Sequence, residues 1–132
     1  MAGYSPKSLA DKLGFKPGMA ILPLAAPQDY RALIGSDAKF AAKPPKGGAD
    51  FIHLFVTSLA ELDAQLPRAR QAMKPDGMLW VSWYKKAAKI PTDVTEDLIR
   101  ARALKTDLVD VKVCAVSDVW SGLKLVVRKH LR

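Results

Sequence analysis

The sequence predicts a single three-layer α/β domain, residues 1–132, with a mostly parallel sheet that ends in an antiparallel C-terminal hairpin. Apolar runs of strand length alternate with amphipathic helices, which is typical of parallel strands joined by helical crossovers. Right-handed crossovers place helices on both faces of such a sheet. The last two apolar runs, 109–116 and 123–129, are separated only by residues 117–122. This connection is too short for a parallel crossover, so we expect a hairpin.

The N-terminal third predicts two short helices and two strands. Ser5 and Pro6 have the residue types that cap and start a helix. Glycines end both helices, because glycine adopts the left-handed C-cap conformation without steric cost. In chain order we expect a helix that starts at Ser5 and ends before Gly14, a strand at 19–24, a helix at 27–34 and a weak strand at 39–42.

Residues 50–83 give the most regular pattern in the chain. Residues 50–56 are apolar on both alternating faces, as in a strand covered on both sides. Ser58 and Glu61 have the spacing of a capping box. The helical stripe that follows consists of Leu59, Leu62, Leu66, Ala69 and Met73.

Proline, glycine and capping residues predict where the next elements break, turn and begin. Pro67 lies inside the apolar stripe and predicts a kink or a break in that helix. Residues 74–77 (KPDG) predict a turn into a second apolar strand at 78–83. Asp93 and Glu96 predict a second capping box, ahead of a helix that extends to Leu104.

The net charge of +8 is spread over both ends of the chain. Residues 1–49 have seven basic and three acidic side chains, residues 50–84 three and four, and residues 85–132 eleven and six. A dispersed basic surface attracts polyanions only weakly, and the one aromatic-basic cluster is at residues 83–86. Weak nucleic-acid binding is therefore kept as an alternative and not as the main expectation.

Targeting signals are missing from the sequence. No apolar run approaches the roughly 20 residues that span a bilayer. The N-terminal residues lack the apolar segment of a signal peptide. The single cysteine, Cys114, has no internal disulfide partner. We expect a cytoplasmic protein without a membrane partner.

The segments DFIHLFV (50–56) and KPDGMLWVSW (74–83), with the helix and hairpin that follow, resemble the C-terminal half of class I S-adenosylmethionine-dependent methyltransferases. The whole chain also resembles a family of small bacterial proteins catalogued as a domain of unknown function. That resemblance rests on residues 13–27, 50–58, 77–87, 92–97 and 109–129. It implies a Rossmann-like, truncated methyltransferase-like sheet, and it brings no established activity or catalytic residues.

The chain departs from the methyltransferase pattern after the first strand. Those enzymes have a glycine-rich turn there, whose backbone N–H groups hold the cofactor. Here residues 24–28 contain no glycine, and Pro27 has no N–H. An acidic residue for the ribose is also missing after Phe40. The sequence therefore disfavours S-adenosylmethionine as a cofactor, and a divergent methyltransferase remains the alternative.

Ligands of such sheets bind beyond the carboxyl ends of the strands. We expect Trp83 and Trp120 to rim one crevice there, with Lys85 and Lys86 supplying positive charge for an anionic or flat aromatic ligand. The alternative is that both tryptophans are packing residues. The candidate ligand-binding residues are Ala25, Ala26, Thr57, Ser58, Trp83, Lys85, Lys86 and Trp120.

The sequence offers no catalytic set. His53 lies within an apolar strand and predicts a hydrogen-bonded core histidine. Cys114 lies within a strand pattern, and the two histidines and one cysteine form no zinc motif. The expected function is a non-catalytic module that binds an unidentified small molecule or protein. A homodimer through the exposed sheet edges is a further option.

Overall fold

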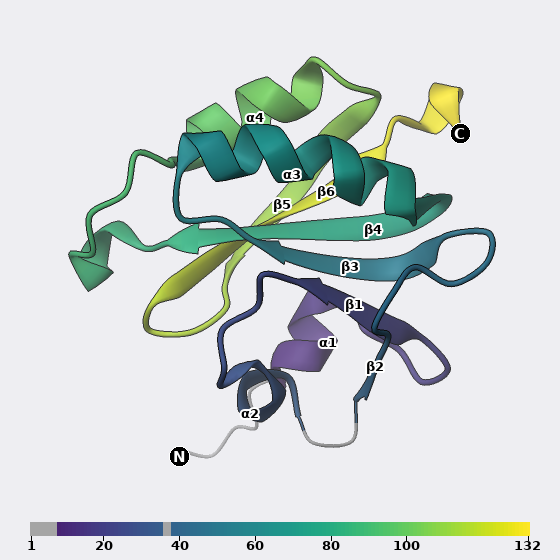
Figure 1. Ribbon diagram of the computed structural model, residues 1–132, viewed down its shortest axis with the longest axis horizontal. Coiled ribbons are helices and arrows are strands. Elements are labelled where there is room, and N and C mark those ends of the chain that lie inside the picture. The colour runs from purple at the N-terminus through teal and green to yellow at the C-terminus, as the bar shows by residue number, and fades with distance from the viewer. Residues whose placement is uncertain (1–7, 36–37) are drawn as a thin grey trace.

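The computed structural model describes residues 8–35 and 38–132, which form one six-stranded sheet with flanking helices (Figure 1). The predicted α/β class is confirmed. In chain order the elements are α1 (Leu9–Leu13), β1 (Ala20–Leu24), α2 (Tyr30–Ile34), β2 (Lys39–Phe40), β3 (Ala49–Phe55), α3 (Leu59–Ala72), β4 (Met73–Tyr84), the 3₁₀-helix η1 (Lys86–Ala88), α4 (Glu96–Leu104), β5 (Leu108–Ala115), β6 (Trp120–Val127) and the 3₁₀-helix η2 (Lys129–Leu131).

The first helix begins later than the sequence predicts. The expected start at Ser5 and Pro6 lies outside the described residues. Within them, α1 begins at Leu9, and the Ser8 hydroxyl accepts a hydrogen bond from the backbone N–H of Asp11 at 3.1 Å. Ser8 is therefore the N-cap of this helix.

The strands are ordered β2-β1-β3-β4-β6-β5. The β2-β1, β1-β3 and β3-β4 pairs are parallel, and β6 is antiparallel to both β4 and β5. The C-terminal hairpin is confirmed, but β6 begins at Trp120, three residues earlier than predicted. A tight turn explains the difference, because the Ser117 hydroxyl accepts hydrogen bonds from the backbone N–H groups of Val119 and Trp120, both at 3.1 Å.

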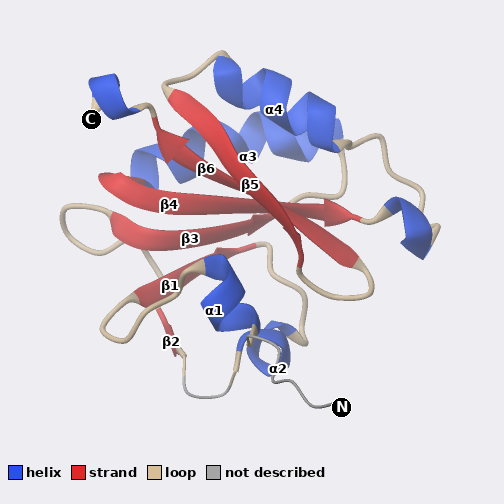
Figure 2. Cartoon of the chain, turned by 180° about the vertical axis from the view of Figure 1, so that it is seen from behind, coloured by secondary structure: helices blue, strands red, loops and turns tan. Residues whose placement is uncertain are grey.

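Two buried clusters lie on opposite faces of the sheet. Helices α3 and α4 cover one face, where Leu62, Leu66 and Ile99 pack on strand residues such as Ile52 and Leu79. Helices α1 and α2 lie against the other face (Figure 2). That second cluster contains Leu13, Ile21, Tyr30, Ile34, Phe51, Phe55, Trp80, Val116 and Trp120.

Strand β4 begins earlier than the sequence predicts. Met73 pairs with Ala49 and Met78 pairs with Phe51, so β4 accommodates the predicted turn residues 74–77 as a bulge. A Cβ atom on Gly77 would lie 2.7 Å from the carbonyl oxygen of Ala49. Only glycine allows this close approach of the two backbones.

A kink or a break was predicted at Pro67; helix α3 is continuous across this residue, so the break is wrong. Leu62, Leu66 and Ala69 of this helix are buried against the sheet on both sides of the proline. The lost backbone hydrogen bond is to the carbonyl of Asp63, an exposed residue, so water can satisfy that carbonyl. Burial of the apolar stripe outweighs the loss of this bond.

Candidate functional site

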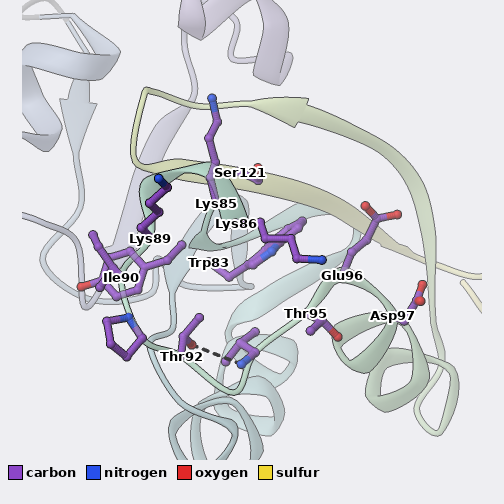
Figure 3. Close-up of a pocket in the computed structure, with 13 residues that line it drawn as sticks. Trp83, Lys85, Lys86, Lys89, Ile90, Thr92, Thr95, Glu96, Asp97 and Ser121 are labelled. Atoms are coloured by element: carbon purple, nitrogen blue, oxygen red, sulfur yellow. Dashed lines mark hydrogen bonds between the residues drawn. The ribbon is translucent and has the colours of Figure 1, made fainter.

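The carboxyl ends of β1, β3 and β4 meet at one edge of the sheet, because these strands are parallel. A cavity of about 800 Å³ lies at the end of β4 (Figure 3). It is formed by the last residues of β4, by η1, by the loop and first turn of α4, and by one residue of β6. The lining residues are Trp83, Tyr84, Lys85, Lys86, Lys89, Ile90, Pro91, Thr92, Val94, Thr95, Glu96, Asp97 and Ser121.

The eight predicted site residues do not form one group. Trp83, Lys85 and Lys86 line the cavity, whereas Ala25, Ala26, Thr57, Ser58 and Trp120 do not. Lys89 and the start of α4 also line the cavity, and neither was predicted as part of a site. Lys89 is the third lysine of the basic loop, so its charge could have been noticed in the sequence. That the loop folds over the end of β4 depends on tertiary contacts, which the sequence does not reveal.

Trp83 and Trp120 lie on opposite faces of the sheet, so they cannot rim one crevice. The register pairs Trp120 with Tyr84, and Trp83 with Ser121. Trp120 stacks on Tyr84 and makes an edge contact with Phe55 in the α1/α2 cluster. Trp83 belongs to the α3/α4 cluster. Trp120 is therefore a packing residue, as the alternative interpretation proposed.

The cavity wall contains three lysines and two carboxylates, and within the described part of the chain only the carboxylates have ion-pair partners. Among the described residues no ion pair involves Lys85, Lys86 or Lys89. The acidic lining residues are already paired: Arg100 binds Glu96 at 2.6 Å and Asp97 at 3.0 Å. The hydrogen bonds that Arg100 donates, to Glu96 first and then to Asp110, raise its pKa.

The lysine side chains differ in direction. Lys86 reaches across the cavity in Figure 3, whereas Lys85 directs its ammonium group away from the other labelled residues. The apolar side of the cavity is lined by the buried Trp83 and Val94 and by the exposed Ile90, which form its apolar floor. An anion with a flat or apolar portion matches this combination of surfaces.

Lys89 has an unfavourable backbone conformation. Its φ is 56° and its ψ is 31°, in the left-handed region, where it caps η1 and donates its N–H to the carbonyl of Lys86. A residue with a Cβ costs about 1–2 kcal/mol in this region, and glycine costs far less. Backbone strain of this kind clusters at functional sites, so the side chain of Lys89 is a candidate for a ligand contact.

The other group of predicted residues lies around the start of α3. Ser58 caps this helix by accepting from the N–H of Glu61 at 3.1 Å. The Glu61 carboxylate accepts from the N–H of Thr57 at 2.6 Å, one residue before the position that a capping box predicts. The Asp93 carboxylate accepts from the N–H of Leu59 at 2.8 Å. Three backbone donors at this helix start are therefore occupied by the protein's own side chains.

The predicted capping box of Asp93 and Glu96 is consequently wrong. Thr95 caps α4 by accepting from the N–H of Leu98 at 3.2 Å. Asp93 acts instead on α3, and the Thr92 hydroxyl donates to the carbonyl of Thr57 at 2.8 Å. The loop before α4 is thereby fixed to the end of β3.

His53 is a fully buried core residue, as predicted. Its Nδ1 lies 2.8 Å from the Tyr30 hydroxyl, and its Nε2 lies 2.6 Å from the Ser82 hydroxyl. Burial lowers the pKa of His53 to about 3 and raises that of Tyr30, so both groups are neutral at pH 7. Neither lines the cavity.

No other chemistry-bearing cluster emerges in the described part of the chain. Burial raises the pKa of Cys114, which therefore stays a thiol. The described residues contain no group of three or more histidine, cysteine or acidic side chains arranged to hold a metal ion. None of the described helices has the length and apolar character needed to cross a membrane.

The fold is that of a methyltransferase-like α/β domain. The crystal structure of a ribosomal protein L11 methylase from Lactobacillus delbrueckii subsp. bulgaricus is similar, with a TM-score of 0.51 and 11% sequence identity. The match covers 90% of this chain and 62% of the methylase chain. At this identity the similarity shows the fold alone. No family model and no curated protein matches the sequence, so the resemblance to a small bacterial family stays a prediction.

Proposed function

We propose that this protein is a non-catalytic binding module that holds a small anionic ligand with a flat or apolar portion at the end of β4. The observation that carries the proposal is the charge distribution of the cavity. Lys86 and Lys89 lack an acidic partner among the described residues, while Glu96 and Asp97 are both ion-paired to Arg100. An anion that enters would gain charge-assisted hydrogen bonds without displacing an existing ion pair.

The lining residues support binding and not catalysis. The described cavity wall contains no histidine and no cysteine, and its carboxylates are engaged by Arg100. The buried Tyr30–His53–Ser82 group has no access to it. A nucleophile activated by a positioned base is therefore missing from the wall.

A thermal-melting screen with inorganic phosphate, salicylate and adenosine monophosphate tests this proposal. We expect salicylate or the nucleotide to raise the melting temperature more than phosphate does, because only they cover the apolar floor. Lys86→Gln should weaken the binding roughly tenfold, the effect of losing one hydrogen bond to a charged group. The control Lys105→Gln removes an exposed charge at the far end of α4 and should change nothing. Equal effects of both variants would contradict the proposal.

A divergent methyltransferase is the second candidate, because the scaffold is methyltransferase-like. The residues at the β1–β3 switch point do not fit S-adenosylmethionine. The turn after β1 has no glycine, Ala25 is exposed with a φ of 56°, and the donors of Thr57, Leu59 and Glu61 are occupied. Calorimetry with millimolar S-adenosylmethionine should give no binding heat. Saturable heat would favour the methyltransferase.

A further inference from the structure

A second basic surface lies on the opposite side of the protein from α3 and α4. Lys112 of β5 and Lys124 of β6 are direct cross-strand partners. Lys124 also pairs with Trp80, which places both lysines on the α1 face of the sheet. Like charges in this position destabilise a strand pair, so their presence requires an explanation.

Helix α1 adds two further lysines to this surface. The Trp80 indole donates a hydrogen bond to the carbonyl of Leu13 at 2.8 Å and fixes the end of α1 over β4. Lys12 and Lys16 flank this anchor point. Lys16 acts electrostatically on Lys124, and Lys12 acts on Cys114, the neighbour of Lys112 two positions along β5. We define Lys12, Lys16, Lys112 and Lys124 as the open-face cluster.

The open-face cluster has little internal compensation. No ion pair within the described residues involves any of its four lysines. Asp110 of β5 binds Arg100 of α4 at 2.9 Å on the other face, and Asp11 of α1 is the acidic neighbour of Lys12. Burial, then Lys112 and then Lys16 lower the pKa of Lys124. Figure 2 shows β5 and the adjoining part of β6 without a helix in front of this face.

We propose that the open-face cluster binds the phosphodiester backbone of nucleic acid without base specificity. Four cations from a helix end and two adjacent strands can contact successive phosphates of one strand, and each contact releases condensed counterions. Base stacking is not part of this site, because Trp80 is fully buried and Phe15 packs edge-on against Phe51. Val111 and Val113 of β5 are exposed beside Lys112, so a lipid surface is the competing occupant that the test must separate.

Fluorescence anisotropy with a labelled 20-nucleotide single-stranded RNA and a 20-base-pair DNA duplex tests this proposal. Binding should weaken with salt with a log–log slope of about −3 to −4 for the duplex, as four phosphate contacts require. Lys16→Gln/Lys112→Gln should reduce the slope by about 2. The double variant should fold as well as the parent, because it relieves repulsion between like charges.

Two controls make the outcome decisive. Lys105→Gln/Lys129→Gln removes the same charge elsewhere and should keep the parental slope. Lys86→Gln should also keep it, which separates this surface from the β4 cavity. Equal slopes for the open-face variant and the charge-matched control would overturn the proposal. Binding to vesicles of phosphatidylserine and phosphatidylcholine without binding to either nucleic acid at 20 mM salt would also overturn it. At this ionic strength the Debye length exceeds the roughly 10 Å found at 0.1 M salt, so exposed charges are only weakly screened.

Discussion

The carboxylate of Asp93 accepts a hydrogen bond from the backbone N–H of Leu59 at 2.8 Å, across 34 positions of sequence. Leu59 is the first residue of α3, and this helix start faces the edge where nucleotide-like ligands bind to related sheets. A carboxylate of the protein itself therefore occupies a backbone donor at this helix start. Asp93 lies between Thr92 and Val94, which line the cavity at the end of β4. The loop that forms the cavity wall therefore also caps the start of α3.

Removal of the Asp93 carboxylate should destabilise the protein. Asp93→Ala should lower the free energy of unfolding by about 1 kcal/mol, the usual effect of losing a cap acceptor at a helix start. Asp93→Asn keeps an acceptor oxygen and should lower it by less. Urea unfolding followed by circular dichroism measures both. Parental stability of Asp93→Ala would show that the contact contributes nothing.

Among the described residues, the non-glycine residues with a positive φ are Ala25 and Lys89, which provide a matched pair. Lys89→Gly and Ala25→Gly should each stabilise the protein by about 0.5–1 kcal/mol, because glycine relieves the strain but gains freedom in the unfolded chain. Only Lys89→Gly should weaken salicylate or nucleotide binding. Calorimetric titration and thermal melting separate the two effects. Equal binding by both variants would remove Lys89 from the site.

The buried histidine predicts a pH dependence of stability. His53 has a folded-state pKa of about 3, below the ordinary 6.5, so the unfolded chain binds a proton that the folded chain does not. Its contribution to stability is therefore present above pH 6.5 and is lost as the pH falls. Between pH 7 and pH 5 the free energy of unfolding should fall by about 2 kcal/mol.

The variant His53→Gln tests the origin of that pH dependence. Glutamine can hydrogen-bond to Tyr30 and Ser82 but does not titrate. Its unfolding free energy should change much less between pH 7 and pH 5 than that of the parent. If the variant keeps the full pH dependence, other groups are responsible.

The positions of the three tryptophans predict that a ligand in the cavity changes the fluorescence emission of Trp83 alone. Trp83 lines the cavity, whereas Trp120 is on the other face and Trp80 is fully buried. Salicylate absorbs close to the indole band, so adenosine monophosphate is the suitable probe. It should change the emission of Trp120→Phe as much as that of the parent. The change should disappear in Trp83→Phe, and its persistence there would place the ligand elsewhere.

The helices and strands were predictable where the local sequence pattern determines them. Residues 50–56 and the stripe from Leu59 to Met73 gave the buried strand and the helix, and the short connection gave the hairpin. The bulge at 74–77 was not predictable, because it depends on the close approach of Gly77 to the backbone of Ala49. A turn and a bulge use the same residue types.

The site was only partly predictable because cross-strand register is not a local property. The side of the sheet on which Trp120 lies follows from its pairing with Tyr84, and no residue near Trp120 fixes that pairing. The same holds for the facing lysines Lys112 and Lys124. Asp93 had the sequence pattern of a local cap, but its partner is the distant residue Leu59.

The most direct test of the proposed cavity is a ¹⁵N-labelled NMR titration with adenosine monophosphate. We expect saturable shifts of backbone amides within residues 83–97 and at Ser121, and little change at residues 25–28 and 57–60. In Lys86→Gln the same amides should shift at roughly tenfold higher ligand concentration. Shifts concentrated at residues 25–28 and 57–60, or no saturable shift up to millimolar ligand, would contradict it.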